Sequence, residues 1–168
     1  MATVKLPLPI LAAMPAATNG AAHKTFAGTN FPVRCIAFDG GSTDESVYWQ
    51  FRLANYGSGN LTLKFMWYAD NASASDVVFG AQIAAITPNT DTQDIETDAF
   101  ATASTVTDTH LGTTAQRLHE ASITISNLDS VAADDFVALR FYRAASSGSD
   151  TMSNDALVVE AELSYSDT

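Results

Sequence analysis

The chain has 168 residues, of which 46% are hydrophobic and only 16% are charged. This length and balance suffice for one domain with its own core and argue against bulk disorder. Its 19 acidic residues outweigh the 8 basic ones and give a net charge of −11. The excess argues against binding to nucleic acid, which needs Lys and Arg to neutralise phosphates, and against docking on anionic membranes.

The single cysteine, Cys35, argues against an intramolecular disulfide and a cysteine-based zinc cluster. It lies in an apolar run and is interpreted as a small buried hydrophobe rather than a reactive thiol. The sequence has no run of about 18 apolar residues, so no transmembrane helix is expected.

Residues 1–30 differ from the rest of the chain, because they are rich in Ala, Pro and Thr and show no alternating pattern. Proline favours extended backbone, and three prolines interrupt the apolar run that a secretion signal would need. The segment is therefore predicted to be an extended N-terminal arm ahead of a sandwich domain at 31–168. We expect the arm to contact another subunit through Leu6, Pro7, Leu8, Pro9, Ile10 and Leu11.

Two alternating stretches, 46–54 and 61–69, form the centre of the predicted fold. In each of them apolar side chains occupy every second position, and each contains one tryptophan, Trp49 or Trp67. Successive side chains of a strand point to opposite faces, so this period predicts two strands with one apolar face each. We expect both tryptophans in the core between two sheets.

Period-two patterns between clusters of Gly, Asn, Asp and Ser predict about eight strands along the chain. The predicted strands span residues 33–38, 46–54, 61–69, 77–86, 104–108, 118–126, 136–143 and 155–165. They predict an all-β, antiparallel β-sandwich that is jelly-roll-like, with an immunoglobulin-like sandwich as the alternative. The long connection at 87–103 is compatible with one short helix around 97–101.

The predicted strand at 77–83 is apolar on both faces. An apolar outer face indicates cover from outside the sandwich, because large apolar patches are seldom left open to water. We expect that cover to come from the arm or from another subunit.

Motifs for catalysis and for metal binding are absent from the sequence: it has no Gly-x-Ser-x-Gly elbow, no phosphate-binding glycine loop and no HExxH. The acidic loop 91–98 lacks the glycine and the terminal glutamate of an EF-hand. His110 and His119 flank a loop and could approach each other, but they lack the short ligand spacing of a zinc site. We therefore predict no catalytic residues, no metal site and no cofactor.

Aromatic and basic side chains on the outward positions of three predicted strands could share one face of a sheet. They are Tyr48, Arg52, Tyr68, Arg140 and Tyr142. Such a face could stack on sugar rings, as in a carbohydrate-binding module. It could also form an oligomer interface, where Tyr and Arg are enriched, and that interpretation is favoured.

Two runs of the sequence also resemble a known class of proteins. The matching residues are Phe38-Asp39, Thr43-Asp44-Glu45, Trp49, Leu53, Asn55-Tyr56-Gly57-Ser58-Gly59, Leu61-Thr62-Leu63, Trp67-Tyr68-Ala69, Leu139-Arg140-Phe141-Tyr142-Arg143, Ser149-Asp150-Thr151-Met152 and Asp155-Ala156-Leu157-Val158-Val159. This pattern resembles small jelly-roll-like structural proteins of tailed bacteriophages, of the head decoration type. The resemblance covers about residues 36–165 and leaves the arm outside.

The resemblance implies a non-enzymatic virion structural protein, namely a capsid decoration protein on the capsid surface that stabilises the head. It implies assembly with itself and with the major capsid protein or another virion protein. A trimer is expected by analogy with jelly rolls around the three-fold axes of viral shells. The alternative is a carbohydrate-binding β-sandwich module of a tail fibre or of a secreted bacterial protein.

Overall fold

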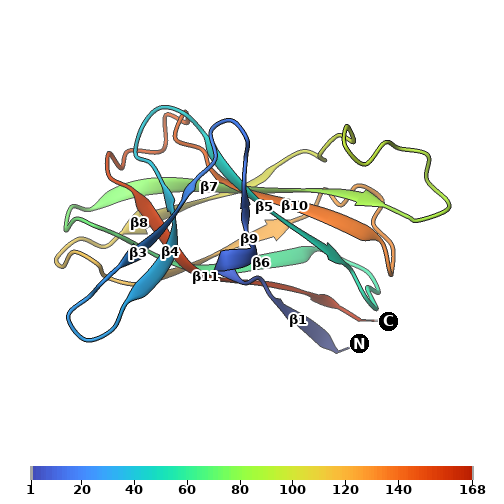
Figure 1. Ribbon diagram of the computed structural model, residues 1–168, viewed down its shortest axis with the longest axis horizontal. Helices are drawn as coiled ribbons and strands as arrows, with labels where there is room; N and C mark the ends of the chain where they lie inside the picture. Colours follow the sequence, from blue (N-terminus) through green and yellow to red (C-terminus); the bar gives the residue numbers. More distant parts are fainter. Residues whose placement is uncertain (1, 168) are drawn as a thin grey trace.

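The computed structural model describes residues 2–167, which form two antiparallel sheets packed face to face (Figure 1). The predicted all-β, antiparallel sandwich is confirmed. Eleven strands are present among the described residues, three more than predicted, and the additional three lie before residue 31.

One sheet has six strands in the order β3-β4-β11-β6-β9, with β1 paired to β11. Their bounds are β1 Thr3–Pro7, β3 Ala22–Phe26, β4 Val33–Phe38, β6 Leu61–Ala69, β9 His119–Ile125 and β11 Ala156–Ser166. The other sheet has five strands in the order β2-β5-β10-β7-β8. Their bounds are β2 Met14–Pro15, β5 Glu45–Arg52, β7 Ser75–Ile86, β8 Ser104–His110 and β10 Phe136–Arg143.

Aromatic side chains from both sheets fill the core. Trp49 and Trp67 are 3% and 0% exposed, which confirms the predicted position of both. The Phe65 ring lies 4.8 Å from Phe79 and 4.9 Å from Phe141, measured between centroids. Edge-to-face and tilted contacts at this separation add to the stabilisation from apolar burial. The period-two pattern thus produces a core by presenting every second side chain of facing strands.

The predicted arm is extended, but its strands belong to the sandwich of its own chain. β1 pairs with β11, β2 with β5 and β3 with β4. Between β1 and β2, Leu8 is 4% exposed and packs in the core, and the Trp49 indole donates a hydrogen bond of 3.0 Å to the Pro9 carbonyl. The arm therefore completes both sheets of its own chain, and its contact with another subunit stays a prediction.

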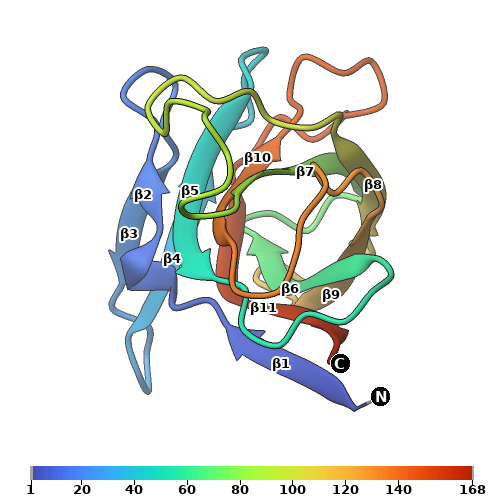
Figure 2. The same cartoon turned by 90° about the vertical axis from the view of Figure 1, so that its right-hand side faces the viewer.

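The long connection 87–103 lies against the outer face of the five-stranded sheet, as Figure 2 shows beside β5. The Ala101 amide donates to the Ile83 carbonyl at 2.9 Å, and the Phe100 ring lies 5.9 Å from Tyr48. The helix considered around 97–101 is absent, since these described residues adopt turns and extended backbone.

The outer face of β7 is covered from within the chain. Val78 is 5% exposed because Tyr142, Ala144 and Ala103 pack against it. The expectation that the arm or another subunit covers this strand is therefore wrong. The side chain of Tyr142 and the connection after β7 provide the cover.

Candidate functional site

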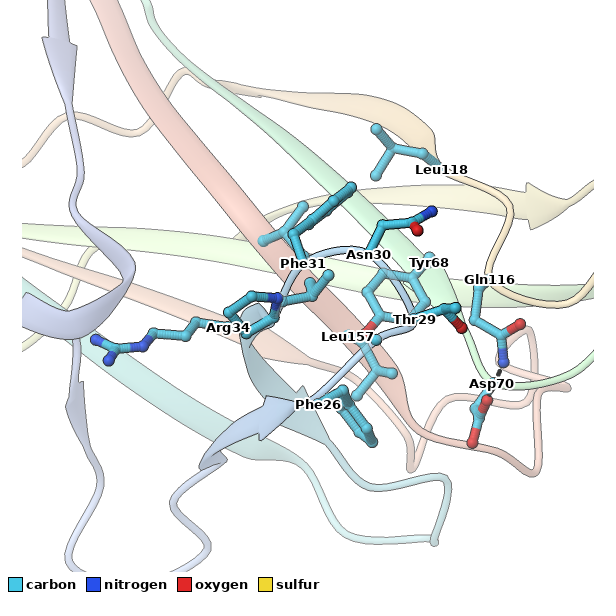
Figure 3. A pocket seen from close by; sticks show the side chains of 14 residues that line it. Phe26, Thr29, Asn30, Phe31, Arg34, Tyr68, Asp70, Gln116, Leu118 and Leu157 are labelled. Carbon is cyan, nitrogen blue, oxygen red and sulfur yellow. Dashed lines mark hydrogen bonds between the residues drawn. The ribbon is translucent and has the colours of Figure 1, made fainter.

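An open groove of about 780 Å³ lies on the outer face of the six-stranded sheet (Figure 3). We call it the outer groove. It is lined by Phe26, Gly28, Thr29, Asn30, Phe31, Pro32, Val33, Arg34, Tyr68, Asp70, Gln116, Leu118, Leu157 and Val159.

The floor of the outer groove is a small apolar cluster on β4, β6 and β11. Tyr68 and Leu157 pack there with Cys35, Val33 and Val159. These residues face outward because their neighbours along each strand face the main core. Burial raises the pKa of the Tyr68 hydroxyl to about 12, and the Cys35 thiol and the Asp70 carboxylate add to the shift. The hydroxyl is therefore neutral and able to donate a hydrogen bond at physiological pH.

One wall of the groove is the connection between β3 and β4. Gly28 has a φ of +61°, and a Cβ atom there would lie 2.1 Å from the Phe31 carbonyl oxygen, so this tight turn needs glycine. The turn presents Phe31, which is 69% exposed, and β3 ends at Phe26, which is 38% exposed. Two aromatic rings therefore stand open to solvent at the same wall.

The opposite wall combines polar and apolar side chains. Asp70 follows β6, and Gln116 and Leu118 lie in the connection before β9. The Gln116 side-chain amide donates to the Asp70 carboxylate, and the Gln116 backbone amide donates to the Ala69 carbonyl at 2.9 Å. These bonds fix the polar pair in place, while Leu118 is 56% exposed.

The Cys35 thiol belongs to the apolar cluster at the floor of the groove. Burial raises the pKa of the Cys35 thiol, which keeps it in the unreactive protonated form. No group of three or more His, Cys, Asp or Glu among residues 2–167 is placed to hold a metal ion. Within the same residues no helix has the length and apolarity required to cross a membrane.

Four of the five aromatic and basic residues singled out in the sequence share the outer face of the five-stranded sheet. Tyr48 and Arg52 lie on β5, and Arg140 and Tyr142 on β10, whereas Tyr68 lies on the other sheet, in the outer groove. The prediction that all five residues could share one face of a sheet is therefore wrong. Alternation gives the face of a strand but not the sheet to which the strand belongs.

The face that carries Arg140 is occupied by contacts within the chain. The Arg140 guanidinium donates to Ser46 Oγ at 2.9 Å and to Gln82 Oε1 at 2.8 Å, and it lies 4.5 Å from the centroid of the Tyr142 ring. Gln82 in turn donates to the Ala101 carbonyl at 2.9 Å. The connection 87–103 leaves a cavity of about 250 Å³ there, much smaller than the outer groove.

The structure places the six arm residues singled out in the sequence at different depths. Of the arm residues, Leu8 is buried, Leu6 and Ile10 pack against the core, and Leu11 is 61% exposed. Pro7 and Pro9 are exposed.

His110 and His119 do approach each other, with ring centroids 4.8 Å apart. They lie at strand ends but are buried between the sheets rather than at the surface.

Sequence reasoning missed most of the outer groove. Phe31 stands in a run of turn-forming residues, 27–32, where an aromatic side chain has no strand face to occupy. That position was the available signal of an exposed ring. Gln116 and Leu118 carried no such signal, because only the folded chain brings them beside Asp70.

No protein-family model and no curated protein sequence matches the chain. Among solved structures, it is similar to the family 11 carbohydrate-binding module from Clostridium thermocellum in complex with a β-1,3-1,4-mixed-linked tetrasaccharide. That likeness has a TM-score of 0.52 at 12% identity and covers 95% of this chain and 94% of that chain. The family 11 module of the cellulosomal cellulase Lic26A-Cel5E of Clostridium thermocellum gives a TM-score of 0.53 at 11% identity, over 97% and 95%.

These structures share the fold and are carbohydrate-binding modules, not capsid proteins. The prediction of a capsid decoration protein located on the virion is therefore wrong. Its physical basis was weak, because the matching residues serve the sandwich itself: Trp67 and Leu63 are core residues, and Gly59 forms a turn with a φ of +83°.

Proposed function

We propose that the chain is a non-catalytic carbohydrate-binding module and that the outer groove holds a segment of a polysaccharide. The observation that carries this proposal is the pair of exposed rings, Phe26 and Phe31, beside a groove of about 780 Å³. A cavity of this size lies within the range of about 300–1,000 Å³ that is typical of ligand sites.

The two kinds of lining group match the two kinds of surface on a sugar. The apolar face of a pyranose ring can stack on an aromatic ring, and Phe31 is open for such a contact. Sugar hydroxyls need hydrogen-bonding partners, and Thr29, Asn30 and Gln116 line the same groove. A polysaccharide segment would therefore find stacking surfaces and polar groups along one path.

The fold supports the proposal, since two solved structures that share it are carbohydrate-binding modules and one of them was determined with a bound tetrasaccharide. A binding module needs no catalytic group, which agrees with a groove whose Cys35 thiol lies beneath the floor in its protonated form. The alternative considered from the sequence, a sugar-binding β-sandwich, is thus the function that the geometry supports best.

Removing the exposed Phe31 ring should weaken glycan binding without destabilising the fold. We expect Phe31→Ala to lower affinity about tenfold, because truncation of an aromatic residue that anchors a ligand costs more than about 1 kcal/mol, and about 1.4 kcal/mol corresponds to tenfold. Isothermal titration calorimetry with a panel of neutral soluble polysaccharides that includes mixed-linked β-glucan would measure this effect.

The matched control is Ile95→Ala, which removes a side chain that is 61% exposed in the connection on the opposite sheet. It should leave affinity unchanged. Absence of binding by the native protein to every polysaccharide of the panel would refute the proposed function. Equal affinity of the native protein and Phe31→Ala would remove the outer groove as its site.

A further inference from the structure

The charge that the outer groove presents to an occupant is negative. Of its lining residues, all of them described, only Arg34 and Asp70 carry a full charge. Val33 and Cys35 face the groove side of β4, so alternation turns Arg34 to the other side, and Figure 3 shows its guanidinium directed away from the groove. The Asp70 carboxylate lies among the groove side chains beside Gln116. An occupant would therefore meet a negative charge and no free positive one among these residues.

A lysine in a neighbouring hollow is already paired with a carboxylate. Lys24 lies in a smaller hollow that shares Phe26, Asp70 and Leu157 with the outer groove. Its ammonium is 2.7 Å from an Asp155 carboxylate oxygen, and this contact raises the pKa of Lys24. Lys24 thus forms its ion pair with Asp155 and not with Asp70.

We infer that the outer groove selects glycans that are neutral along their length and rejects those that carry carboxylate or sulfate groups, an inference that rests on the proposed function. The selection acts at short range through Asp70. A ligand carboxylate at Gln116 would face the Asp70 carboxylate, to which Gln116 donates. Like charges brought together in a binding site oppose the wrong partner, and this repulsion sets specificity.

A second, weaker contribution comes from the whole molecule, whose net charge of −11 repels polyanions. Salt separates the two contributions. At about 0.15 M ionic strength the screening length is about 8 Å, so repulsion from charges elsewhere on the molecule is largely screened while a contact between carboxylates about 4 Å apart persists.

The test compares ligands that differ only in charge. Each neutral polysaccharide that binds in the panel is measured beside a derivative with its C6 hydroxyl groups oxidised to carboxylates. We expect the derivative to bind at least about fivefold more weakly, the ratio that corresponds to two unit charges about 4 Å apart in water. Asp70→Asn should reduce this ratio severalfold, because the asparagine carbonyl still accepts the Gln116 hydrogen bond but carries no charge.

The control is Glu96→Gln, which removes the same charge from an exposed position on the far sheet. It should leave the ratio at about 0.15 M salt unchanged. If the native protein binds both ligands equally, or if Asp70→Asn and Glu96→Gln behave alike, the charge inference falls while the proposed function stands. If no native polysaccharide binds, both fall.

Discussion

A buried ion pair joins the end of β10 to the connection that follows it. The side chains of Arg143 and Asp150 are 0% and 2% exposed, and the guanidinium donates to both carboxylate oxygens at 2.9 and 2.7 Å. Its other N–H groups donate to the carbonyls of Asn154 and Met152. The connection 144–155 is thus held by one side chain from the end of β10.

Breaking this pair should be costly, because one charge would stay buried without a partner. We expect Asp150→Ala to lower the free energy of unfolding by about 3–5 kcal/mol. Urea unfolding followed by tryptophan fluorescence would measure the loss. The double variant Arg143→Met with Asp150→Ala should recover part of it. A single-variant loss below about 1 kcal/mol would contradict this account.

A pair of histidines occupies the gap between the sheets at another edge. The Nε2 atoms of His110 and His119 are buried without a hydrogen-bond partner among the described residues, and the His119 ring lies 5.1 Å from Trp67. Burial lowers the pKa of His119; the neighbouring His110 and Arg117 lower it further, while Asp108 opposes them. The folded chain therefore favours the neutral imidazole.

Mild acid should consequently weaken the fold. His119 is more basic in the unfolded chain, where its pKa has the ordinary value of about 6.5. Stability is complete above that pH and falls below it, by at most about 1.4 kcal/mol per pH unit, until the lower pKa of the folded state is reached.

Urea unfolding at about pH 7.5 and about pH 5.5 would show this dependence. His119→Gln should flatten it, and His23→Gln, at an exposed position on β3, should not. An equal pH dependence in all three proteins would exclude His119 as the cause.

At the scale of elements, the segment before β2, residues 3–13, connects the two sheets, and we call it the seam. β1 (Thr3–Pro7) extends the pairing of β11, and the short 3₁₀ turn η1 (Ile10–Ala12) then leads the chain across to β5. Leu8 enters the core at the crossing point. Deleting residues 2–25 would remove this seam.

One substitution tests the seam without removing a strand. Leu8→Ala should lower the free energy of unfolding by about 2–5 kcal/mol, the usual range for a buried leucine. Leu11→Ala, at a side chain that is 61% exposed, is the matched control and should change stability little. If both variants unfold at the same urea concentration, the segment is an arm after all.

The central strands could be predicted because their pattern is local. β4, β6 and β10 agree residue for residue with the expected spans 33–38, 61–69 and 136–143. β1 and β2 could not, since two to five residues with prolines give too little alternation, and their pairing depends on β11 and β5, which are distant in sequence.

At the scale of the whole molecule, the site was harder to predict than the fold. Tyr68 was selected from its outward position, but it was grouped with residues of the other sheet. The groove needs Phe31 and Gln116, which come from connections 85 positions apart in the chain. The predicted homo-oligomer stays a prediction, and sedimentation equilibrium is the measurement that decides it.

The antiparallel pairing of β1 with β11 places Thr3 opposite Ser166, so the chain enters and leaves the sandwich at one point. Figure 1 shows the start of β1 and the end of β11 on the side of the molecule opposite the β3–β4 connection, which forms a wall of the outer groove. A biotin attached at either terminus would orient every copy on a sensor chip in the same way, with Phe31 directed toward the solution. The protein could therefore be immobilised as a uniform layer, in which neighbouring copies leave one another's outer groove accessible.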